Sequence, residues 1–303
     1  MSYSALLPPS IRSQVRYWLE EDCPSIDIGG YVVGEKLEVA HLLCKGDCCL
    51  AGVPFAQAVF DELGLSVVWK KEEGSLITVG GIGGGRVICA EVRGKCKDIL
   101  HAERTALNIL SRASGVATAA RRAVDISKSA EWHGYLAGTR KTTPGFRSVE
   151  KYALIVGGAA THRQDLSQMV MLKDNHIWSA GSITAAVQKA RSVAGFSIKI
   201  EVECQSVDEA IEAANAGADV VMLDNFTAET IHAAAAQVKA ACPNVLIEAS
   251  GGITEEALPG FMGPHIDVIS RGGLTHGYNC IDFSLKVVTA LHVAQCKGEK
   301  EEG

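Results

Sequence analysis

The sequence lacks any run of about 18 or more apolar residues, so we expect no membrane-spanning helix. Its first residues, MSYSALLPPSIRSQVRYWLEED, lack the charged start and long apolar run of a secretion signal. It also lacks an excess of positive charge, because 29 Lys and Arg residues stand against 35 Asp and Glu residues. A nucleic acid partner requires a broad basic surface. We therefore expect a cytoplasmic protein that binds neither membranes nor nucleic acids.

The ten cysteines lack the spacing of a zinc site. Cys44, Cys48 and Cys49 cluster, but no C-x-x-C pair is present and no histidine follows at zinc-finger distance. Free buried thiols in a reducing cytosol are the favoured interpretation. A disulfide or a metal site is the alternative.

The first 115 or so residues mix helix and strand patterns. An amphipathic helix is predicted from Ser10, a second helix in VPFAQAVFDELG, and strands in EVAHLLCKGDCCLAG and LSVVWKKEEG. The glycine run from Gly80 to Gly85 precedes RVICAEVRG, which reads as a strand. A nucleotide-binding glycine loop should open a helix, so this run is interpreted as a flexible loop. A long helix is predicted from Ile99 to Ala130, with Arg104 turned away from its apolar face.

From about residue 132, apolar strands alternate with helices, which predicts an α/β fold with a parallel sheet covered on both faces. The segment VEKYALIVGG is assigned to a helix, because its apolar residues fall on one face and two glycines follow. The regular spacing of strands and helices along the sequence is that of a β/α barrel or a doubly wound sheet. Six strands are predicted, at residues 134–138, 169–173, 198–203, 219–223, 245–249 and 266–270.

Charged residues follow the predicted strands at their carboxyl ends. In parallel α/β folds these ends form one rim, where functional residues gather. The rim carries both signs of charge, in Arg140, Lys141, Arg163 and Lys173 on the basic side and Glu203 and Asp224 on the acidic side. An acidic protein that focuses positive charge at one rim is suited to anionic ligands.

Several of these residues also have structural interpretations. Arg147 and Lys151 are expected to be solvated or to cap a helix, because charged side chains are rarely buried. Lys173 alone would be an ordinary lysine at a strand end. Asp224 could serve only as a helix cap before TAET. Taken together, however, the charged strand ends favour an anion site that also binds a metal ion or a hydroxyl-rich group.

Two glycine pairs, at Gly251–Gly252 and Gly272–Gly273, follow the last two predicted strands. Backbone N–H groups in such loops can surround a phosphate, and glycine permits its close approach. In barrels a phosphate is often bound at the last two strand ends. Tight turns without any ligand are the alternative.

The segments GTRKTTPGFR, HRQDLSQMVMLKDNH, EVEC, MLDNF, EASGGI and HIDVISRGGLTH together resemble the quinolinate phosphoribosyltransferase family. LLPP, EVRG, ERTALNILSRASG and DFSLK extend the resemblance over nearly the whole chain. It implies an N-terminal α/β open sandwich over residues 1–115 and an incomplete β/α barrel over 116–279, with one strand more than the six predicted. It further implies that a segment of about 280–303 packs back on the first domain.

The resemblance implies an enzyme that transfers phosphoribosyl from phosphoribosyl pyrophosphate to quinolinate, with Mg²⁺, in de novo NAD biosynthesis. The products would be nicotinate mononucleotide, pyrophosphate and CO₂. The family dimerises, often into hexamers, and each active site takes an arginine from the partner. The position in this chain that matches this arginine is Arg104.

The resemblance also assigns roles at the rim. The implied catalytic residues are Lys141, Lys173, Glu203 and Asp224, the last two also holding the magnesium ion and the ribose hydroxyls. The residues implied to bind the quinolinate carboxylates are Arg140, His162 and Arg163, together with Arg104 of the partner. The 5-phosphate would be held by Ser250, Gly251 and Gly272, with His276 nearby.

Two features depart from the family pattern, the glycine run and Arg271, which stands where an apolar residue is expected. Two rival functions also remain open on the residues alone. A strand-end lysine would suit a Schiff-base aldolase, and a barrel with a phosphate loop would suit a non-catalytic phosphometabolite-binding protein.

Overall fold

The computed structural model describes residues 3–80 and 85–288 and divides into two compact units. The first unit comprises Met1–Thr118 and Asn279–Gly303, and the second comprises Ala119–Tyr278. The division falls within the long helix α4, three residues after the predicted boundary at 115. The glycine run from Gly80 to Gly85 lies largely outside the described residues.

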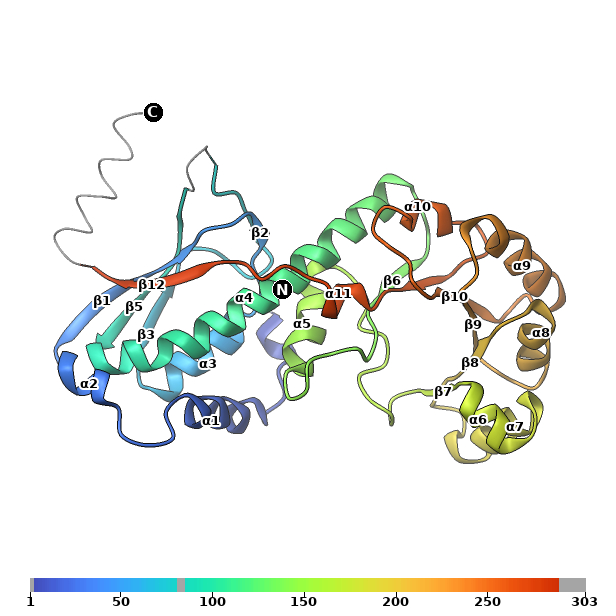
Figure 1. Cartoon of the computed structure of the whole chain (residues 1–303), viewed down its shortest axis with the longest axis horizontal. Helices are drawn as coiled ribbons and strands as arrows, with labels where there is room; N and C mark the ends of the chain where they lie inside the picture. Colours follow the sequence, from blue (N-terminus) through green and yellow to red (C-terminus); the bar gives the residue numbers. More distant parts are fainter. Residues whose placement is uncertain (1–2, 81–84, 289–303) are drawn as a thin grey trace. The chain divides into compact units, whose positions relative to one another are not determined.

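The first unit is a four-stranded antiparallel sheet with helices packed beside it (Figure 1). The strand order is β12-β1-β5-β3, so the strand nearest the C-terminus pairs with the first strand of the chain. Of the segment predicted to pack back, residues 289–303 lie outside the described part. The elements are η1 (Tyr3–Leu6), α1 (Ile11–Asp22), α2 (Ile28–Val33), β1 (Leu37–Cys44), β2 (Cys48–Cys49), α3 (Val53–Glu62), β3 (Ser66–Trp69), β4 (Leu76–Ile77), β5 (Val87–Lys95), α4 (Cys96–Ser129) and β12 (Phe283–Val287).

The second unit is a parallel sheet of six strands in the order β6-β11-β10-β9-β8-β7. Helices alternate with the strands along the chain and lie outside the sheet (Figure 1). The elements are β6 (Tyr135–Ala137), α5 (Arg147–Gly157), β7 (Val170–Leu172), α6 (Asp174–Ala180), α7 (Ile183–Ala194), β8 (Ile200–Cys204), α8 (Val207–Asn215), β9 (Val220–Asp224), α9 (Ala228–Ala241), β10 (Leu246–Ser250), α10 (Leu258–Phe261), β11 (Val268–Ser270) and α11 (Gly273–His276).

All six predicted strands are confirmed, and the central ones are buried on both faces, as expected of a parallel sheet between helix layers. The additional strand implied by the resemblance is not formed as a strand in the described residues. Ala160 makes a single parallel bridge to Ala137 at the β6 edge of the sheet. The barrel is therefore incomplete, with six strands and one bridging residue.

Local signals in the sequence explain where the helices begin and end. The side chain of Ser206 accepts a hydrogen bond from the backbone N–H of Glu209 and so caps α8. Gly158 ends α5 in the left-handed conformation, with φ of 94°. In α4, the predicted apolar face is buried, whereas Arg104 and Asn108 are exposed.

The nine cysteines of the described residues are free thiols, and six of them are buried. This confirms the preference for thiols over disulfides at these nine positions. Among residues 3–80 and 85–288, no helix combines the length and apolar character that a membrane crossing requires.

Candidate active site

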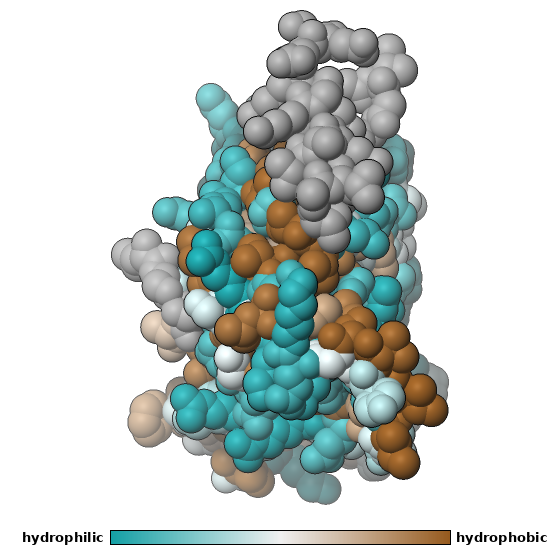
Figure 2. All heavy atoms as spheres, turned by 90° about the vertical axis from the view of Figure 1, so that its left-hand side faces the viewer, coloured by the Kyte–Doolittle hydropathy of each residue, from teal (hydrophilic) through white to brown (hydrophobic). Residues whose placement is uncertain are grey.

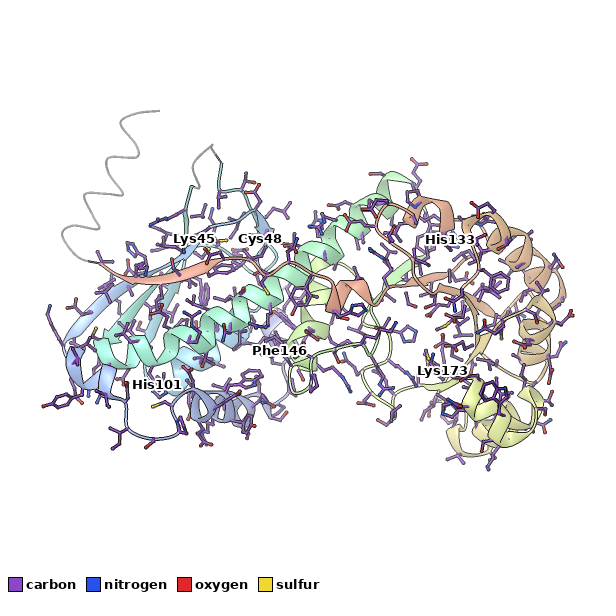
Figure 3. The ribbon with its side chains drawn as sticks, viewed as in Figure 1. Lys45, Cys48, His101, His133, Phe146 and Lys173 are labelled. Carbon is purple, nitrogen blue, oxygen red and sulfur yellow. The ribbon has the colours of Figure 1, made fainter. Side chains whose placement is uncertain are left out.

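The parallel sheet of the second unit brings the predicted functional residues to one edge. Because all six strands run in the same direction, their carboxyl ends lie together, and most of the predicted residues are at or just after such an end. His162 and Arg163 lie instead between α5 and β7, and Arg104 is on α4. Arg140 and Lys141 follow β6, Lys173 lies between β7 and α6 (Figure 3), and Asp224 ends β9. The sequence prediction of a shared rim agrees with this arrangement.

Four basic side chains form what we call the cation cluster, which comprises Arg140, Arg147, Lys151 and Arg163. None of the four makes an ion pair with a carboxylate among the described residues, although two of them are buried and the other two are half-buried. Burial and then the neighbouring Arg140 lower the pKa of Arg163. Positive charges gathered without counter-ions in a partly dehydrated site are unfavourable unless an anion joins them.

The arginines of the cluster are held by neutral acceptors. Arg147 donates from Nε to the hydroxyl of Thr142, at 3.1 Å. Arg163 donates from Nη1 to the carbonyl of Met169, at 3.2 Å. The Nε of Arg140 is buried and has no hydrogen-bond partner in the described structure. Neutral acceptors orient these guanidinium groups, and the more distant acids Glu201 and Glu248 offset only part of the lowering of the pKa of Arg163.

Glu150 fixes the loop that carries Arg140 and leads to Arg147 at the start of α5. Its carboxylate is fully buried on α5 and accepts hydrogen bonds from the backbone N–H of Thr143, at 2.9 Å, and from the hydroxyl of the same residue, at 2.8 Å. The hydroxyl of Tyr278 also reaches it, at 3.4 Å. The buried carboxylate therefore has partners of its own, and it determines the shape of the loop after β6.

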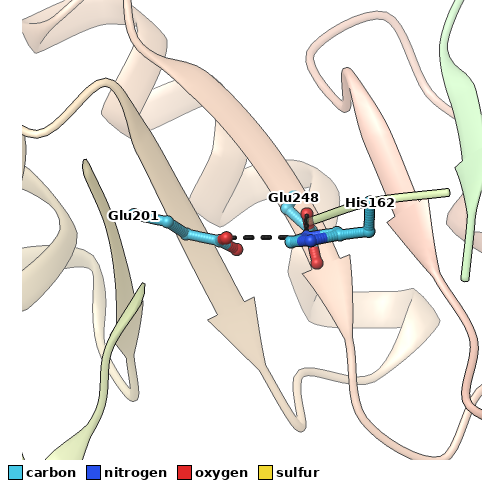
Figure 4. Close-up of side chains that lie close together, drawn as sticks. All are labelled: His162, Glu201 and Glu248. Atoms are coloured by element: carbon cyan, nitrogen blue, oxygen red, sulfur yellow. Dashed lines mark hydrogen bonds and ion pairs between the residues drawn. The ribbon is translucent and has the colours of Figure 1, made fainter. Parts of the chain in front are cut away.

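His162, Glu201 and Glu248 point toward one another inside the sheet (Figure 4). Nε2 of His162 lies 3.0 Å from Oε2 of Glu248 and 3.5 Å from Oε2 of Glu201. Glu248 also accepts a hydrogen bond from the hydroxyl of Ser270, at 2.6 Å. Burial and then the neighbouring Glu248 raise the pKa of Glu201, whose two oxygens have no hydrogen-bond partner within residues 3–80 and 85–288.

The protonation of His162 follows from its other ring nitrogen. Nδ1 accepts a hydrogen bond from the backbone N–H of Arg163, at 2.8 Å, so Nε2 carries the proton and donates to Glu248. A metal ion at Nε2 would require the opposite tautomer. The three side chains have the composition of a metal site, but the hydrogen bonds favour a polar network. For His162 to contact a substrate carboxylate, one of its two hydrogen bonds must open.

The acidic side of the rim lies at β8 and β9. Glu203 is paired with the ammonium of Lys173, and it is the one residue of β8 that is not fully buried. Asp224 accepts a hydrogen bond from the side chain of Asn225, at 2.6 Å. The residue that caps α9 is Thr227, so the interpretation of Asp224 as a helix cap is wrong.

The first glycine of each pair, Gly251 after β10 and Gly272 after β11, is packed too closely for a larger residue. Gly251 has φ of 99°, and a Cβ there would lie 2.4 Å from Oδ1 of Asn225. A Cβ on Gly272 would lie 2.8 Å from Cδ of Lys141 and 2.7 Å from Nε2 of His276. These contacts place Lys141 and His276 beside the Gly272 loop.

The structure places the remaining predicted residues as follows. Arg271 is half-buried and donates from Nε to the carbonyl of Ile253, at 2.9 Å, while its Nη1 is buried without a hydrogen-bond partner. Ser250 ends β10. Arg104 belongs to the first unit, where it is exposed on α4, so no statement about its distance from the rim follows from the single chain. Sequence reasoning missed Glu150, Glu201 and Glu248, and only the position of Glu201 two residues before Glu203 hinted at an inward-facing side chain.

The expectation that Lys151 is solvated or caps a helix is wrong. Its side chain is buried in the middle of α5, at 1% exposure. The helical period of α5 places Lys151 beside the apolar face. The residues from Val149 to Leu154 are all buried, however, so this part of the helix has no solvent face.

The family models describe both parts of the chain. The C-terminal domain of quinolinate phosphoribosyl transferase matches residues 116–286, and the N-terminal domain of the same enzyme matches residues 27–114. The chain therefore belongs to the quinolinate phosphoribosyl transferase family.

Individual relatives agree with the family match. The chain is 52% identical over 284 residues to a nicotinate-nucleotide pyrophosphorylase (carboxylating) of Rattus norvegicus, covering 93% of each protein. It is 51% identical to the protein of that name from Homo sapiens, again with 93% of each covered. The solved structure of the nicotinate-nucleotide pyrophosphorylase from Francisella tularensis superimposes with a TM-score of 0.83 at 33% identity, covering 93% of this chain and 98% of that one.

Proposed function

We propose that this chain transfers the phosphoribosyl group of phosphoribosyl pyrophosphate to quinolinate with loss of CO₂, the reaction that the names of its family and relatives describe. Nicotinate mononucleotide and pyrophosphate are the other products, as in NAD biosynthesis. The observation that carries the proposal is the cation cluster, because four basic groups without carboxylate partners suit a small ring that bears two carboxylates.

The cation cluster would bind quinolinate. The guanidinium groups of Arg140 and Arg163 would each match a carboxylate through two parallel hydrogen bonds. Arg140 supports this role because its Nε is buried and has no hydrogen-bond partner among the described residues. His162 would complete the site beside Arg163, to whose backbone it is already bonded.

The acidic side and the glycine loops would bind the phosphoribosyl donor. Lys141 and Lys173 would lie between the two reactants and stabilise the departing pyrophosphate. The loop residues Ser250, Gly251 and Gly272 would hold the 5-phosphate, with His276 beside Gly272. Focusing these charges at one rim positions two anions that would otherwise repel each other.

Magnesium suits the donors at the acidic side. Glu203 and Asp224 offer carboxylate oxygens at the ends of adjacent strands, and Mg²⁺ prefers a few such ligands together with substrate phosphates. Bound there, the ion would neutralise pyrophosphate charge. The ion pair between Glu203 and Lys173 would rearrange to free the carboxylate.

The chemistry requires no enzyme nucleophile. The pyridine nitrogen attacks the anomeric carbon while the bond to pyrophosphate breaks, and the ribosyl centre gains positive charge that Glu203 and Asp224 stabilise. Loss of CO₂ from C2 then leaves an electron pair beside the cationic ring nitrogen, and a proton takes its place. The residues act by orientation and electrostatics.

We further infer a homodimer that shares its active sites, with Arg104 serving the partner's cation cluster. Helix α2 supports an interface in this region, because Ile28, Tyr31 and Val32 are each at least 73% exposed. Figure 2 looks at this side of the first unit and shows apolar residues between hydrophilic ones. Backbone hydrogen bonds join the end of α2 to the start of α4, the helix that carries Arg104. Assembly of dimers into a hexamer and a cytoplasmic location are proposed with it.

The test of this function is CO₂ release from quinolinate, measured with and without phosphoribosyl pyrophosphate. We expect release only when both reactants are present. Nicotinic acid, which has one carboxylate, should be a very poor substrate because it leaves part of the cation cluster unpaired. Comparable turnover of nicotinic acid would refute the quinolinate assignment.

A further inference from the structure

Lys151 is the most deeply buried member of the cation cluster. Its ammonium donates hydrogen bonds to the backbone carbonyls of Thr161 and Arg163, the latter at 3.0 Å. No carboxylate pairs with it in the described parts of the chain. Burying a lysine that is 1% exposed and bonded only to two carbonyls costs free energy, so packing alone does not account for it.

The two carbonyls flank His162, which adopts an unusual backbone conformation. Its φ is 56°, in the left-handed region that residues with a side chain rarely occupy. Such a turn persists only when its surroundings hold it. Lys151 bonds to the residue before the turn and to the residue after it, so it holds the turn from both sides. The same turn carries Arg163 into the cation cluster.

The electrostatic surroundings of Lys151 are almost entirely positive. Burial, and then Arg147, Arg140 and Arg163, lower the pKa of Lys151 to about 8. Arg147 lies on the same helix, Arg140 on the loop before it and Arg163 on the loop after it. Among its other neighbours, the carboxylate of Glu150 accepts hydrogen bonds from Thr143, and Nδ1 of His162 accepts one from the backbone of Arg163. An incoming anion would favour the charged form of this lysine.

We propose that Lys151 is a positioning residue for the aromatic dicarboxylate, which fixes the turn at His162 and adds its charge to the field that the substrate carboxylates meet. The inference rests on the quinolinate site proposed above. It assigns to Lys151 an indirect role, through the backbone that presents Arg163.

The proposal has a consequence for pH. The ammonium is charged below pH 8 and loses its proton as the pH rises through that value. A bound dianion favours the charged form, so binding takes up protons near pH 8 and weakens above it. An arginine at position 151 would keep its charge throughout this range.

The experiment measures quinolinate and phosphoribosyl pyrophosphate binding by calorimetry, between about pH 7 and pH 9. The variants are Lys151→Met, Lys151→Arg and the control Lys189→Met, the same change at an exposed lysine of α7. At pH 7 we expect Lys151→Met to weaken quinolinate binding roughly 10- to 100-fold, because two carbonyls lose a charged donor. Affinity for phosphoribosyl pyrophosphate should stay within about threefold, and Lys189→Met should match the wild type in both.

Lys151→Arg should recover most of the quinolinate affinity and lose the decline between pH 7 and pH 9. It also takes up no protons on binding, in contrast to the wild type. If Lys151→Met proves too unstable to study, the pH dependence of Lys151→Arg alone decides. An unchanged decline in Lys151→Arg would overturn the proposal, as would equal losses of affinity for both substrates in Lys151→Met.

The controls separate this inference from the proposed function. A wild-type protein that does not bind quinolinate refutes the proposed function and this inference with it. A wild-type protein that binds quinolinate without releasing CO₂ refutes only the reaction, and the comparison of binding by the lysine variants still decides the role of Lys151. Unaltered quinolinate binding in Lys151→Met, with normal turnover in the wild type, refutes only the role of Lys151.

Discussion

Two sets of basic residues, one in each unit, are partnered in opposite ways. In the first unit, Lys95 and Lys97 both pair with Glu35 on the surface, and Arg93 pairs with Glu91. In the second unit, the cation cluster is buried or half-buried and bonded to neutral acceptors. The exposed side chains have acids beside them and water around them, while the enclosed ones have neither.

The difference separates two uses of charge. Exposed ion pairs contribute little to stability, because water screens them and side-chain order is lost. Enclosed cations without partners oppose folding, and they persist where a ligand supplies the missing charge. The comparison therefore supports the proposed binding site independently of any similarity to other proteins, and it can be tested variant by variant.

Removing a guanidinium from the cation cluster should have the largest effect. We expect Arg163→Ala to lower kcat/KM for quinolinate. The decrease should correspond to a loss of about 2–5 kcal/mol in transition-state stabilisation. Arg140→Lys should also be strongly impaired, because a point charge cannot reproduce the planar fork of arginine. Steady-state kinetics decide the matter, and values within a few-fold of wild type for both variants would mean that the carboxylate site is elsewhere.

The next experiment asks whether an exposed arginine of the first unit belongs functionally to the second. Arg104→Ala and Lys173→Ala should each be nearly inactive. Refolded together, half of the dimers are mixed, and in each of these one site carries both changes and the other carries neither. About a quarter of wild-type activity should return. No recovery, with mixed dimers confirmed by mass, would show that Arg104 acts within its own chain or on the surface only.

On the acidic side the expected effect is smaller and more selective. Asp224→Asn removes the negative charge that the metal ion and the developing ribosyl cation favour, so we expect a roughly tenfold weaker response to Mg²⁺ and phosphoribosyl pyrophosphate. Quinolinate binding should change little. Calorimetric titration of each ligand distinguishes the two, and a selective loss of quinolinate affinity would reverse the assignment.

The smallest effect is expected in the first unit. Lys97→Met breaks one of the exposed ion pairs to Glu35, and Lys95 remains beside that carboxylate. We expect kcat/KM to stay within about twofold of wild type and Tm to fall by less than about 4 °C. A large loss of activity here would erase the contrast between the two sets of basic residues.

Much of the fold could be predicted because its signals are local. Buried parallel strands are continuous apolar runs, and Ser206 and Gly158 mark helix ends by their own chemistry. The resemblance implied a seventh strand, but the described residues form only a single bridge at Ala160 in its place. Whether such a bridge becomes a strand depends on how far the edge of the sheet extends. The short helix α2 was missed because its two glycines oppose a helix.

The site was predictable to the extent that its residues follow strands. Lys141, Lys173 and Asp224 are found at strand ends for that reason, and the enzyme class agrees with the comparisons. Lys151 and Glu150 were beyond reach, because they lie in a helix whose burial on every side is set by tertiary packing. Their roles, and those of the other site residues, remain predictions to be tested by the variants above.

The close packing of Gly251 against Asn225 has a consequence for which donors the rim can accept. The backbone N–H of Asn225 bonds to the carbonyl of Ser250, at 3.1 Å, and no side chain fits between the two loops. The loop assigned to the 5-phosphate and the loop beside Asp224, the acid assigned to the ribose, are therefore held next to each other. We expect a sugar with one extra carbon between its phosphate and its hydroxyls to be too long to reach both, so that length, as well as charge, decides which donor reacts.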